Sequence, residues 1–208
     1  MKRLYLLRHG QTEFNVKKLV QGRCDSPLTD LGRQQAGMAA AWLKAHGVVP
    51  DKVVSSPLGR AMDTAQLVAT ELLGPDAAAE PREGIIERCY GTFEEGPHDA
   101  LPTDVWDPGE DLVPFGGEGS KALQERMVAT LTNLMGAKGI ETLLAVSHGS
   151  ASRQFIKAVA PGGFEFPTKL PNCAIMIFDF EEEKSGEEGN APQSKFILQQ
   201  IIDPQQSH

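Results

Sequence analysis

The sequence predicts an α/β fold, a three-layer α/β/α sandwich with a mostly parallel central sheet and a short insertion that forms a cap over a functional site. Two observations carry this prediction. Segments typical of a strand, a turn and a helix alternate along most of the chain. Two apolar runs, residues 4–7 and 143–146, also have the length and composition of buried parallel strands, and each leads through one polar residue into a His-Gly pair.

The first half of the chain begins with a strand at residues 3–7, followed by a polar loop. Thr29 is then placed to cap a helix over residues 30–46, with Gly47 as its stop, and a strand follows at 52–55. The apolar residues that recur at helical spacing in this helix are Leu31, Met38, Ala41, Trp42 and Ala45.

A second helix is expected to open with Ser56 as its cap and Pro57 at its first position, and to end before Gly74. Its buried face is predicted to be Leu58, Ala61, Ala65, Leu67, Val68 and Leu72. The later elements are a helix at 120–135, a strand ending at Ser147, a helix at 149–159, and a hairpin of strands 173–180 and 196–201 with a long polar loop.

The regular pattern stops between residues 90 and 119, in a stretch rich in Pro, Gly and Asp. We interpret it as an insertion, at about 88–120, within a single domain that spans 1–208. The stretch carries eight carboxylates and no Lys or Arg. A multiply anionic ligand is therefore expected to be repelled there.

Composition narrows the possible functions. The net charge is −8, with 28 carboxylates against 20 Lys and Arg and no basic run, which argues against a nucleic-acid or anionic-membrane partner. Cys24, Cys89 and Cys173 are isolated, which is typical of free thiols in a reducing compartment. The apolar stretch near the amino terminus is too short for a signal peptide or a membrane span. These features predict a cytoplasmic protein.

The two His-Gly pairs indicate where the site lies. In open α/β sheets, ligands bind at the carboxyl ends of the strands, beside helix starts whose free N–H groups favour an anion. If the two strands are neighbours, Arg8, His9 and His148 converge on one crevice. The expected ligand of that crevice is a phosphate group.

Four segments in the same order resemble the motifs of one family. They are residues 8–15 with Gln21-Gly22 and 25–29, the Ser-Ser-Pro-Leu-Gly-Arg-Ala segment at 55–61, Glu87, and the Ser-His-Gly at 147–149. Together they resemble the histidine phosphatase superfamily, which includes the cofactor-dependent phosphoglycerate mutases. Phosphatase motifs built on Cys, on Asp-x-Asp-x-Thr or on a zinc-binding His-Glu-x-x-His are absent from the sequence.

The resemblance implies a role for each matching residue. His9 would be the nucleophile that forms a phosphohistidine, Arg8, Arg60 and His148 would bind the phosphate, and Glu87 would give a proton to the leaving oxygen, with neither metal nor cofactor. Glu94 and Glu95 are alternatives to Glu87 for the role of proton donor, because they lie only a few residues further along the chain. The substrate-binding residues implied are Asn15, Gln21, Gly22, Arg88, Tyr90 and Gly149.

Three functions remain open at this stage. The insertion is short and lacks the adjacent arginine pair of the mutases, which favours a metal-independent phosphomonoesterase acting on a small phosphate ester. The Glu-Arg-Cys-Tyr-Gly segment at 87–91 resembles the mutases, and Arg88 with Lys121 offers one extra anion contact, so a cofactor-dependent mutase is the alternative. A non-catalytic phosphate-binding or regulatory module is the second alternative, and His98 is a further residue able to reach the site.

Overall fold

A computed structural model describes residues 1–160, 170–182 and 194–206 of the chain. Within these residues, six strands form one sheet in the order β3-β2-β4-β1-β5-β6. The first four strands in that order are parallel to one another, whereas β5 is antiparallel to both of its neighbours, β1 and β6. This arrangement confirms the mostly parallel sheet. The strands are β1 (Lys2–Arg8), β2 (Lys52–Ser55), β3 (Glu80–Pro81), β4 (Thr142–Ser147), β5 (Ile175–Glu182) and β6 (Ser194–Ile202).

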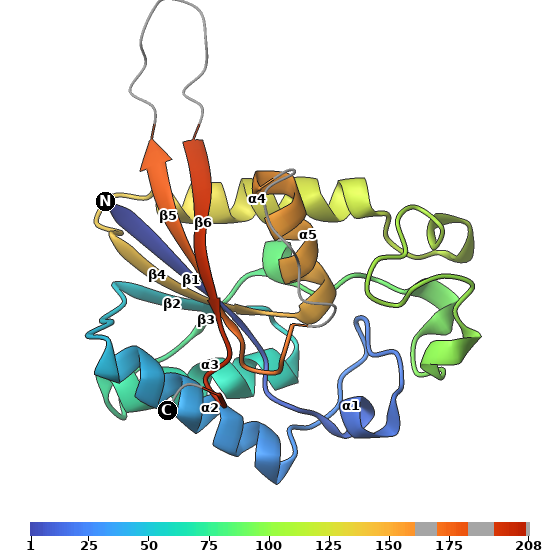
Figure 1. Cartoon of the computed structure of the whole chain (residues 1–208), viewed down its shortest axis with the longest axis horizontal. Helices are drawn as coiled ribbons and strands as arrows, with labels where there is room; N and C mark the ends of the chain where they lie inside the picture. The colour runs from blue at the N-terminus through green and yellow to red at the C-terminus, as the bar shows by residue number, and fades with distance from the viewer. Residues whose placement is uncertain (161–169, 183–193, 207–208) are drawn as a thin grey trace, which may run out of the picture.

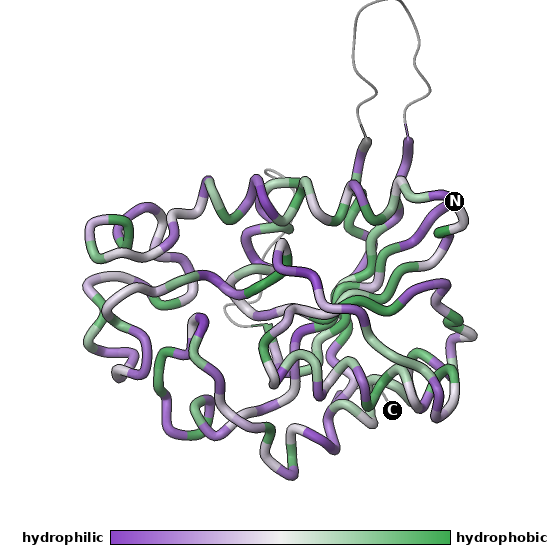
Figure 2. The backbone as a smooth tube through the Cα atoms, turned by 180° about the vertical axis from the view of Figure 1, so that it is seen from behind, coloured by the Kyte–Doolittle hydropathy of each residue, from purple (hydrophilic) through white to green (hydrophobic). Residues whose placement is uncertain are grey.

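Helices cover both faces of the sheet, as the three-layer prediction requires (Figure 1). One face packs on α2 (Asp30–Ala45) and α3 (Gly59–Leu73), and the other packs on α4 (Ser120–Met135) and α5 (Gly149–Val159). The strands are mostly hydrophobic and lie between the two helical layers (Figure 2). Alternate residues of β1 enter opposite cores, with Leu4 and Leu6 on the α4–α5 side and Tyr5 and Leu7 on the α2–α3 side.

The apolar residues singled out in α2 do not form its buried face. Leu31 and Met38 are 42% and 44% exposed, whereas Ala36, Ala39, Ala40 and Leu43 are buried. The small alanine side chains let α2 lie close to the sheet and to α3, so packing distance rather than hydropathy selects the buried face. The helix begins as predicted, with the Thr29 hydroxyl accepting from the backbone N–H of Gly32 at 3.0 Å.

The predicted start of the second helix is wrong by two residues. Helix α3 begins at Gly59, and its N-cap residue Leu58 makes no side-chain cap bond. Asp25 supplies the cap from the preceding loop, accepting from the backbone N–H of Gly59 at 2.6 Å and of Arg60 at 3.3 Å. Because Asp25 lies far away in sequence, the local pattern at Ser56 and Pro57 could not reveal it. Leu67, predicted to be buried, is 39% exposed.

The insertion contains three short 3₁₀ helices and a small core of its own. They are η2 (Gly91–Phe93), η3 (His98–Ala100) and η4 (Val113–Phe115); η1 (Glu83–Ile85) precedes the insertion, and α1 (Glu13–Lys17) lies in the loop after β1. Val20 of that loop packs with Tyr90, Leu101 and Leu112 of the insertion. The insertion thus lies against the amino-terminal loop at one end of the molecule (Figure 1).

The carboxyl-terminal hairpin has the expected antiparallel pairing, with Phe180 of β5 opposite Phe196 of β6. The loop predicted between these strands falls at 183–193, outside the described residues, as does His208. In the part of the chain that the structure describes, no helix is both long and apolar enough to cross a membrane.

Candidate active site

The two His-Gly pairs meet because β1 and β4 are parallel neighbours. Arg8 is opposite Ser147 in the register, so His9 and His148 follow directly at the same edge of the sheet. The backbone N–H of His9 donates to the carbonyl of Ser147 at 3.0 Å. The two imidazole rings lie 5.2 Å apart between centroids, nearly edge to face, and both are buried.

A hydrogen bond assigns the proton on His9. Its Nδ1 lies 2.7 Å from the carbonyl oxygen of Gly10. A carbonyl only accepts, so Nδ1 carries the hydrogen and Nε2 keeps a lone pair when the ring is neutral. Burial, followed by the charges of Arg60 and Arg8, holds the pKa of His9 well below its ordinary value. His9 is therefore neutral near pH 7, with the lone pair of the ring on Nε2.

Two buried arginines flank His9. Arg60 is anchored by the Gly22 and Cys24 carbonyls, which accept from Nη2 and Nη1, both at 2.7 Å. Arg8 donates through Nη1 to the Leu170 carbonyl, and its guanidinium carbon lies 5.5 Å from the centre of the Trp106 ring. Burial lowers the pKa of Arg8 to about 10, which leaves it charged at neutral pH.

Several buried polar atoms at this edge lack a partner among the described residues. They include Nε of Arg8, Nε of Arg60 and Nδ1 of His148. Buried polar groups are nearly always hydrogen-bonded, and two positive charges in one crevice need a counter-ion. The arrangement is suited to a tetrahedral anion such as phosphate. His148 itself is held by Ser56, whose hydroxyl lies 2.7 Å from its Nε2.

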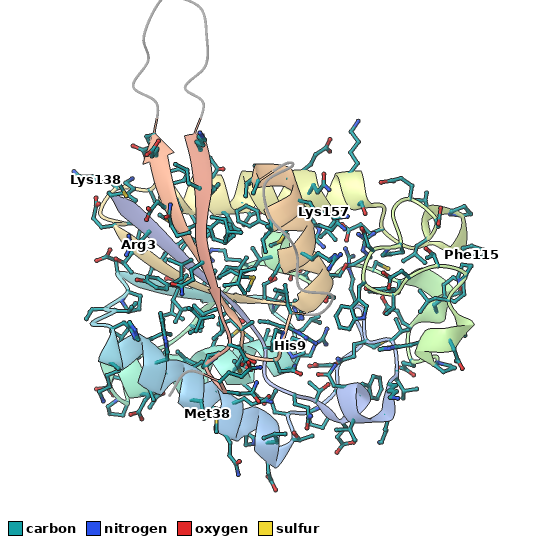
Figure 3. The ribbon with its side chains drawn as sticks, viewed as in Figure 1. Arg3, His9, Met38, Phe115, Lys138 and Lys157 are labelled. Atoms are coloured by element: carbon teal, nitrogen blue, oxygen red, sulfur yellow. The ribbon has the colours of Figure 1, made fainter. Side chains whose placement is uncertain are left out.

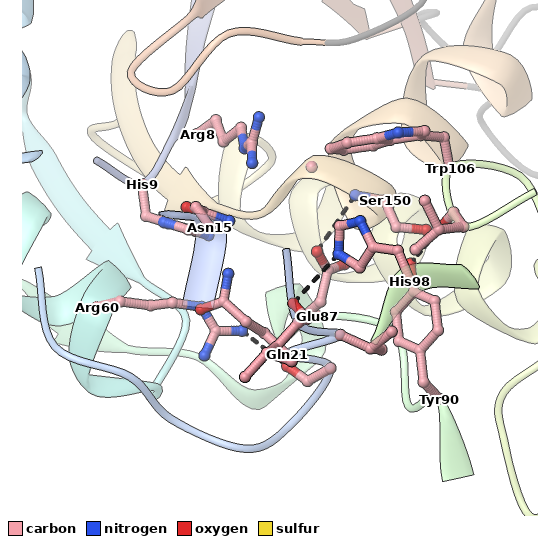
Figure 4. Close-up of a pocket in the computed structure, with 15 residues that line it drawn as sticks. Arg8, His9, Asn15, Gln21, Arg60, Glu87, Tyr90, His98, Trp106 and Ser150 are labelled. Atoms are coloured by element: carbon pink, nitrogen blue, oxygen red, sulfur yellow. Dashed lines mark hydrogen bonds between the residues drawn. The ribbon is translucent and has the colours of Figure 1, made fainter. Parts of the chain in front are cut away.

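Glu87 is held at the amino end of α5. Its Oε1 accepts from the backbone N–H groups of Arg88 at 2.9 Å and Ala151 at 2.8 Å. Among the described residues, Oε2 accepts from the backbone N–H of Ser150 alone, at 3.2 Å (Figure 4). Oε2 therefore keeps more unused acceptor capacity than Oε1. Because Glu87 lines the same pocket as His9, it can reach a group bound there.

One pocket brings most of the predicted site residues together (Figure 4). It is a small hollow that is partly open to solvent. Of the predicted residues it is lined by Arg8, His9, Asn15, Gln21, Gly22, Arg60, Glu87, Tyr90 and Gly149. The pocket is also lined by Leu19, Val20, His98, Val105, Trp106 and Ser150, of which sequence reasoning had singled out only His98 for this role.

The insertion supplies the outer wall of this pocket. Tyr90 turns its ring inward because its hydroxyl donates to the Val105 carbonyl at 2.8 Å. Trp106 comes close enough to Gly149 that a Cβ on that glycine would lie 3.2 Å from the indole. Trp106 was visible in the sequence only as an isolated aromatic in an irregular segment.

The loop after β1 is organised by Thr12, which caps α1 and donates to Oε1 of Gln21 at 2.9 Å. Asn172, missed by the sequence reasoning, donates through Nδ2 to the His9 carbonyl at 3.1 Å and to Oδ1 of Asn15 at 3.2 Å. No sequence motif marks Asn172, because only the return of the chain alongside β1 brings it here.

Other candidate residues lie outside the pocket lining. Arg88 is fully buried, and its side chain donates to Ser150, Gly109, Glu118 and Ser120. Lys121 is exposed on α4, away from His9.

The competing carboxylates of the insertion are also engaged elsewhere. Glu94 accepts from the backbone N–H of Arg23 at 3.0 Å and of Tyr90 at 2.9 Å. None of the eight insertion carboxylates lines the pocket. Asp107 is bound to Gln154 and Lys157, and Glu118 is bound to Arg126. Direct repulsion of a bound anion by the insertion, as the sequence suggested, is therefore not supported by the contacts.

No metal centre is evident in the described part of the chain, where no three His, Cys, Asp or Glu side chains are placed to hold an ion. The three cysteines are free.

Comparison with known proteins gives consistent matches. Residues 4–188 match the histidine phosphatase superfamily (branch 1). The chain is 34% identical to a protein of Proteus mirabilis (strain HI4320) named probable phosphoglycerate mutase GpmB, over 87% of this chain and 86% of that protein.

Two solved structures extend the comparison. YhfR of Bacillus stearothermophilus has a TM-score of 0.77 at 26% identity, covering 95% of each chain. A phosphoserine phosphatase of Entamoeba histolytica has a TM-score of 0.75 at 28% identity in a variant bound to phosphoserine, covering 99% of this chain and 98% of the other. The same phosphatase, bound to 3-phosphoglyceric acid, has a TM-score of 0.73 at 29% identity, covering 97% and 96%.

Proposed function

Because the chain belongs to branch 1 of the histidine phosphatase superfamily, we propose that it is a metal-independent phosphomonoesterase that acts on a small phosphorylated metabolite through a phosphohistidine at His9. The observation that carries this proposal is the 2.7 Å contact of Nδ1 of His9 with the Gly10 carbonyl, which assigns the ring proton to Nδ1. It leaves Nε2 with a lone pair in a pocket that also contains two arginines and Glu87.

The proposed reaction has two displacements. Nε2 of His9 attacks phosphorus, the bond from phosphorus to the ester oxygen breaks, and Glu87 gives its proton to that oxygen, which leaves as an alcohol. Glu87, now a carboxylate, takes a proton from water as the water oxygen attacks phosphorus and the N–P bond breaks. Arg8, Arg60 and His148 would donate to the phosphate oxygens in both steps.

Hydrolysis is favoured over phosphoryl return to a sugar acid by the distribution of charge. Arg8 and Arg60 are the basic side chains of the pocket lining, and both are placed to serve the reacting phosphate. Lys18 lines an adjoining hollow. A bisphosphate cofactor would lack the paired arginines that hold its second phosphate, so a monophosphate ester is the better fit. The free cysteines support a cytoplasmic location as part of the proposal.

A specific observation favours the mutase as a second candidate: the relative of 34% identity carries that name. The two reactions are distinguished by incubating the protein with 3-phosphoglycerate, with and without 2,3-bisphosphoglycerate, and measuring both inorganic phosphate and 2-phosphoglycerate. A panel of other monophosphates is assayed in parallel. We expect phosphate release from panel members without isomerisation. Isomerisation that requires the bisphosphate would refute the hydrolase assignment.

Two variants test whether the site is catalytic. His9→Ala should abolish both turnover and acid-labile labelling of the protein by ³²P substrate, whereas His46→Ala, which removes an exposed histidine stacked on Trp42, should retain both. EDTA should leave activity unchanged. Phosphate binding without phosphate release by the unaltered protein would instead support the non-catalytic module.

A further inference from the structure

The segment that delivers Glu87 to the pocket is not part of the sheet. It consists of η1 and the residues that follow it, and it runs along α4. Three of its carbonyls accept from one guanidinium, that of Arg126: Nη1 donates to Gly84 at 3.1 Å and to Ile86 at 2.7 Å, and Nη2 donates to Glu87 at 3.1 Å. Arg126 thus contacts the backbone of the segment up to Glu87 itself.

Arg126 is in turn held by Glu118, the residue that ends the insertion two positions before α4. Nε donates to Oε1 of Glu118 at 2.7 Å and Nη2 donates to Oε2 at 2.8 Å, a two-point contact between largely buried side chains. Burial would raise the pKa of Glu118, but the hydrogen bonds and charge of Arg126 outweigh it and keep that pKa below its ordinary value. The pair is therefore ionised at neutral pH.

All five N–H groups of the Arg126 guanidinium are used by these contacts. A planar fork can satisfy acceptors on two sides at once, which the compact ammonium of lysine cannot do. The segment also lies tightly on α4, since a Cβ on Gly84 would fall 1.8 Å from the Thr130 hydroxyl. Small displacements of the segment are thus opposed from two directions.

We propose that Arg126, held by Glu118, is a positioning residue that sets the Glu87 carboxyl at the leaving oxygen of the substrate. This inference rests on the proposed function, in which Glu87 protonates that oxygen. Arg126 does not line the pocket, so it acts through the backbone carbonyls of the segment. A misplaced carboxyl loses proton transfer while the phosphate contacts made by His9 and the pocket arginines persist.

The test compares two aryl phosphates, one with and one without a 4-nitro group, whose leaving groups differ in their need for a proton. The 4-nitrophenolate group leaves readily as an anion, whereas the phenolate group of phenyl phosphate leaves slowly without protonation. Because a positioned general acid contributes on the order of 100-fold or more, Arg126→Gln should lower kcat/KM for phenyl phosphate by about 10- to 100-fold and for 4-nitrophenyl phosphate by less than about 3-fold. The kcat/KM of Arg126→Lys for phenyl phosphate should lie between those of Arg126→Gln and the unaltered protein.

Glu87→Gln provides the reference for this selectivity. If Glu87→Gln lowers kcat/KM equally for both substrates, the proton-donor role in the proposed function fails. If Glu87→Gln lowers kcat/KM mainly for phenyl phosphate but the Arg126 variants lower it equally for both substrates, only the positioning role of Arg126 fails. Arg3→Gln is the control, because it breaks another arginine–carboxylate pair, with Asp179, at the opposite end of β1 from His9 (Figure 3).

Glu118→Gln makes the test independent of whether Arg126→Gln folds. It keeps a side chain of the same size but removes the charge that orients Arg126. We expect the same preference for 4-nitrophenyl phosphate, smaller in size, together with an alkaline limb of the kcat/KM profile that shifts for phenyl phosphate only, because only that substrate needs the protonated general acid. Equal losses for both substrates in Glu118→Gln and Arg126→Lys would overturn the inference.

Discussion

Asp25 is predicted to stabilise the start of α3 and, through it, the orientation of Arg60. Its carboxylate accepts from the backbone N–H groups of Gly59 and Arg60 and from Nη1 of Arg60 at 3.3 Å. Leu58, the N-cap residue, offers no side-chain acceptor. Asp25→Ala therefore removes the side-chain cap of the helix that carries Arg60, the arginine proposed to bind phosphate.

The size of the effect follows from these contacts. Loss of a helix cap costs about 1 kcal/mol, within a range of about 0.5–2. The ion pair with Arg60 adds about 0–1 kcal/mol, at the low end because the Asp25 side chain is 46% exposed. The total of about 1–2 kcal/mol corresponds to a fall in Tm of about 2–8 °C for a chain of this length. Since Arg60 keeps its bonds to the Gly22 and Cys24 carbonyls, kcat/KM should fall by less than about 10-fold.

Thermal unfolding and steady-state kinetics of Asp25→Ala and Asp25→Asn would test this reasoning. The asparagine keeps one acceptor oxygen and should lose about half as much stability as the alanine. Asp63→Asn, at an exposed position within the same helix, is the control and should leave Tm unchanged. An unchanged Tm in Asp25→Ala, or a loss of activity far beyond 10-fold without loss of stability, would refute it.

Three further predictions concern the pocket. Burial and then arginine charge hold the pKa of His9 and His148 well below 6.5, so the unfolded chain binds more protons than the folded one below that pH. The free energy of unfolding should therefore fall as the pH drops from 6.5 to 5, by up to about 2.7 kcal/mol per unit for both groups, and a flat denaturant-derived profile would contradict this. Gly22→Ala places a Cβ at a left-handed φ of 52° and 2.2 Å from a carboxylate oxygen of the insertion; it should cost about 1–3 kcal/mol in denaturant unfolding and raise KM. Trp106→Leu removes the ring facing the Arg8 guanidinium, worth about 0.5–2 kcal/mol, so KM should rise about 2- to 30-fold, and an unchanged KM would exclude that contact from binding.

The parts of the fold predicted correctly are those with a local or periodic signal. Helices α4 and α5 and strand β2 have the predicted bounds, because a helical or strand-like apolar pattern and its terminating residues lie within the segment itself. The convergence of His9 and His148 was also predictable. Two buried parallel strands that each end in His-Gly bring both histidines to the same edge once the strands pair.

Residues far apart in sequence decided the rest. The cap of α3 is Asp25 and not Ser56, because a helix N–H donates to whichever carboxylate the fold brings near it. Arg88 is buried in a hydrogen-bond network with four partners of the chain, although its motif suggested substrate contact. The charged residues of the insertion bind neighbouring side chains and backbone, so net charge did not predict the charge that faces the pocket.

By itself, therefore, the sequence determined the α/β class, the order of the elements and the edge of the sheet where Arg8 and the two histidines gather. These follow from hydrophobic periodicity and from chain direction, which are properties of short segments. Only the tertiary structure decided which atoms each polar group contacts: the partner of Nδ1 of His9, the backbone donors to the two oxygens of Glu87 and the five bonds of Arg126. Hydrogen bonds act over about 3 Å, and no sequence pattern specifies positions to that precision.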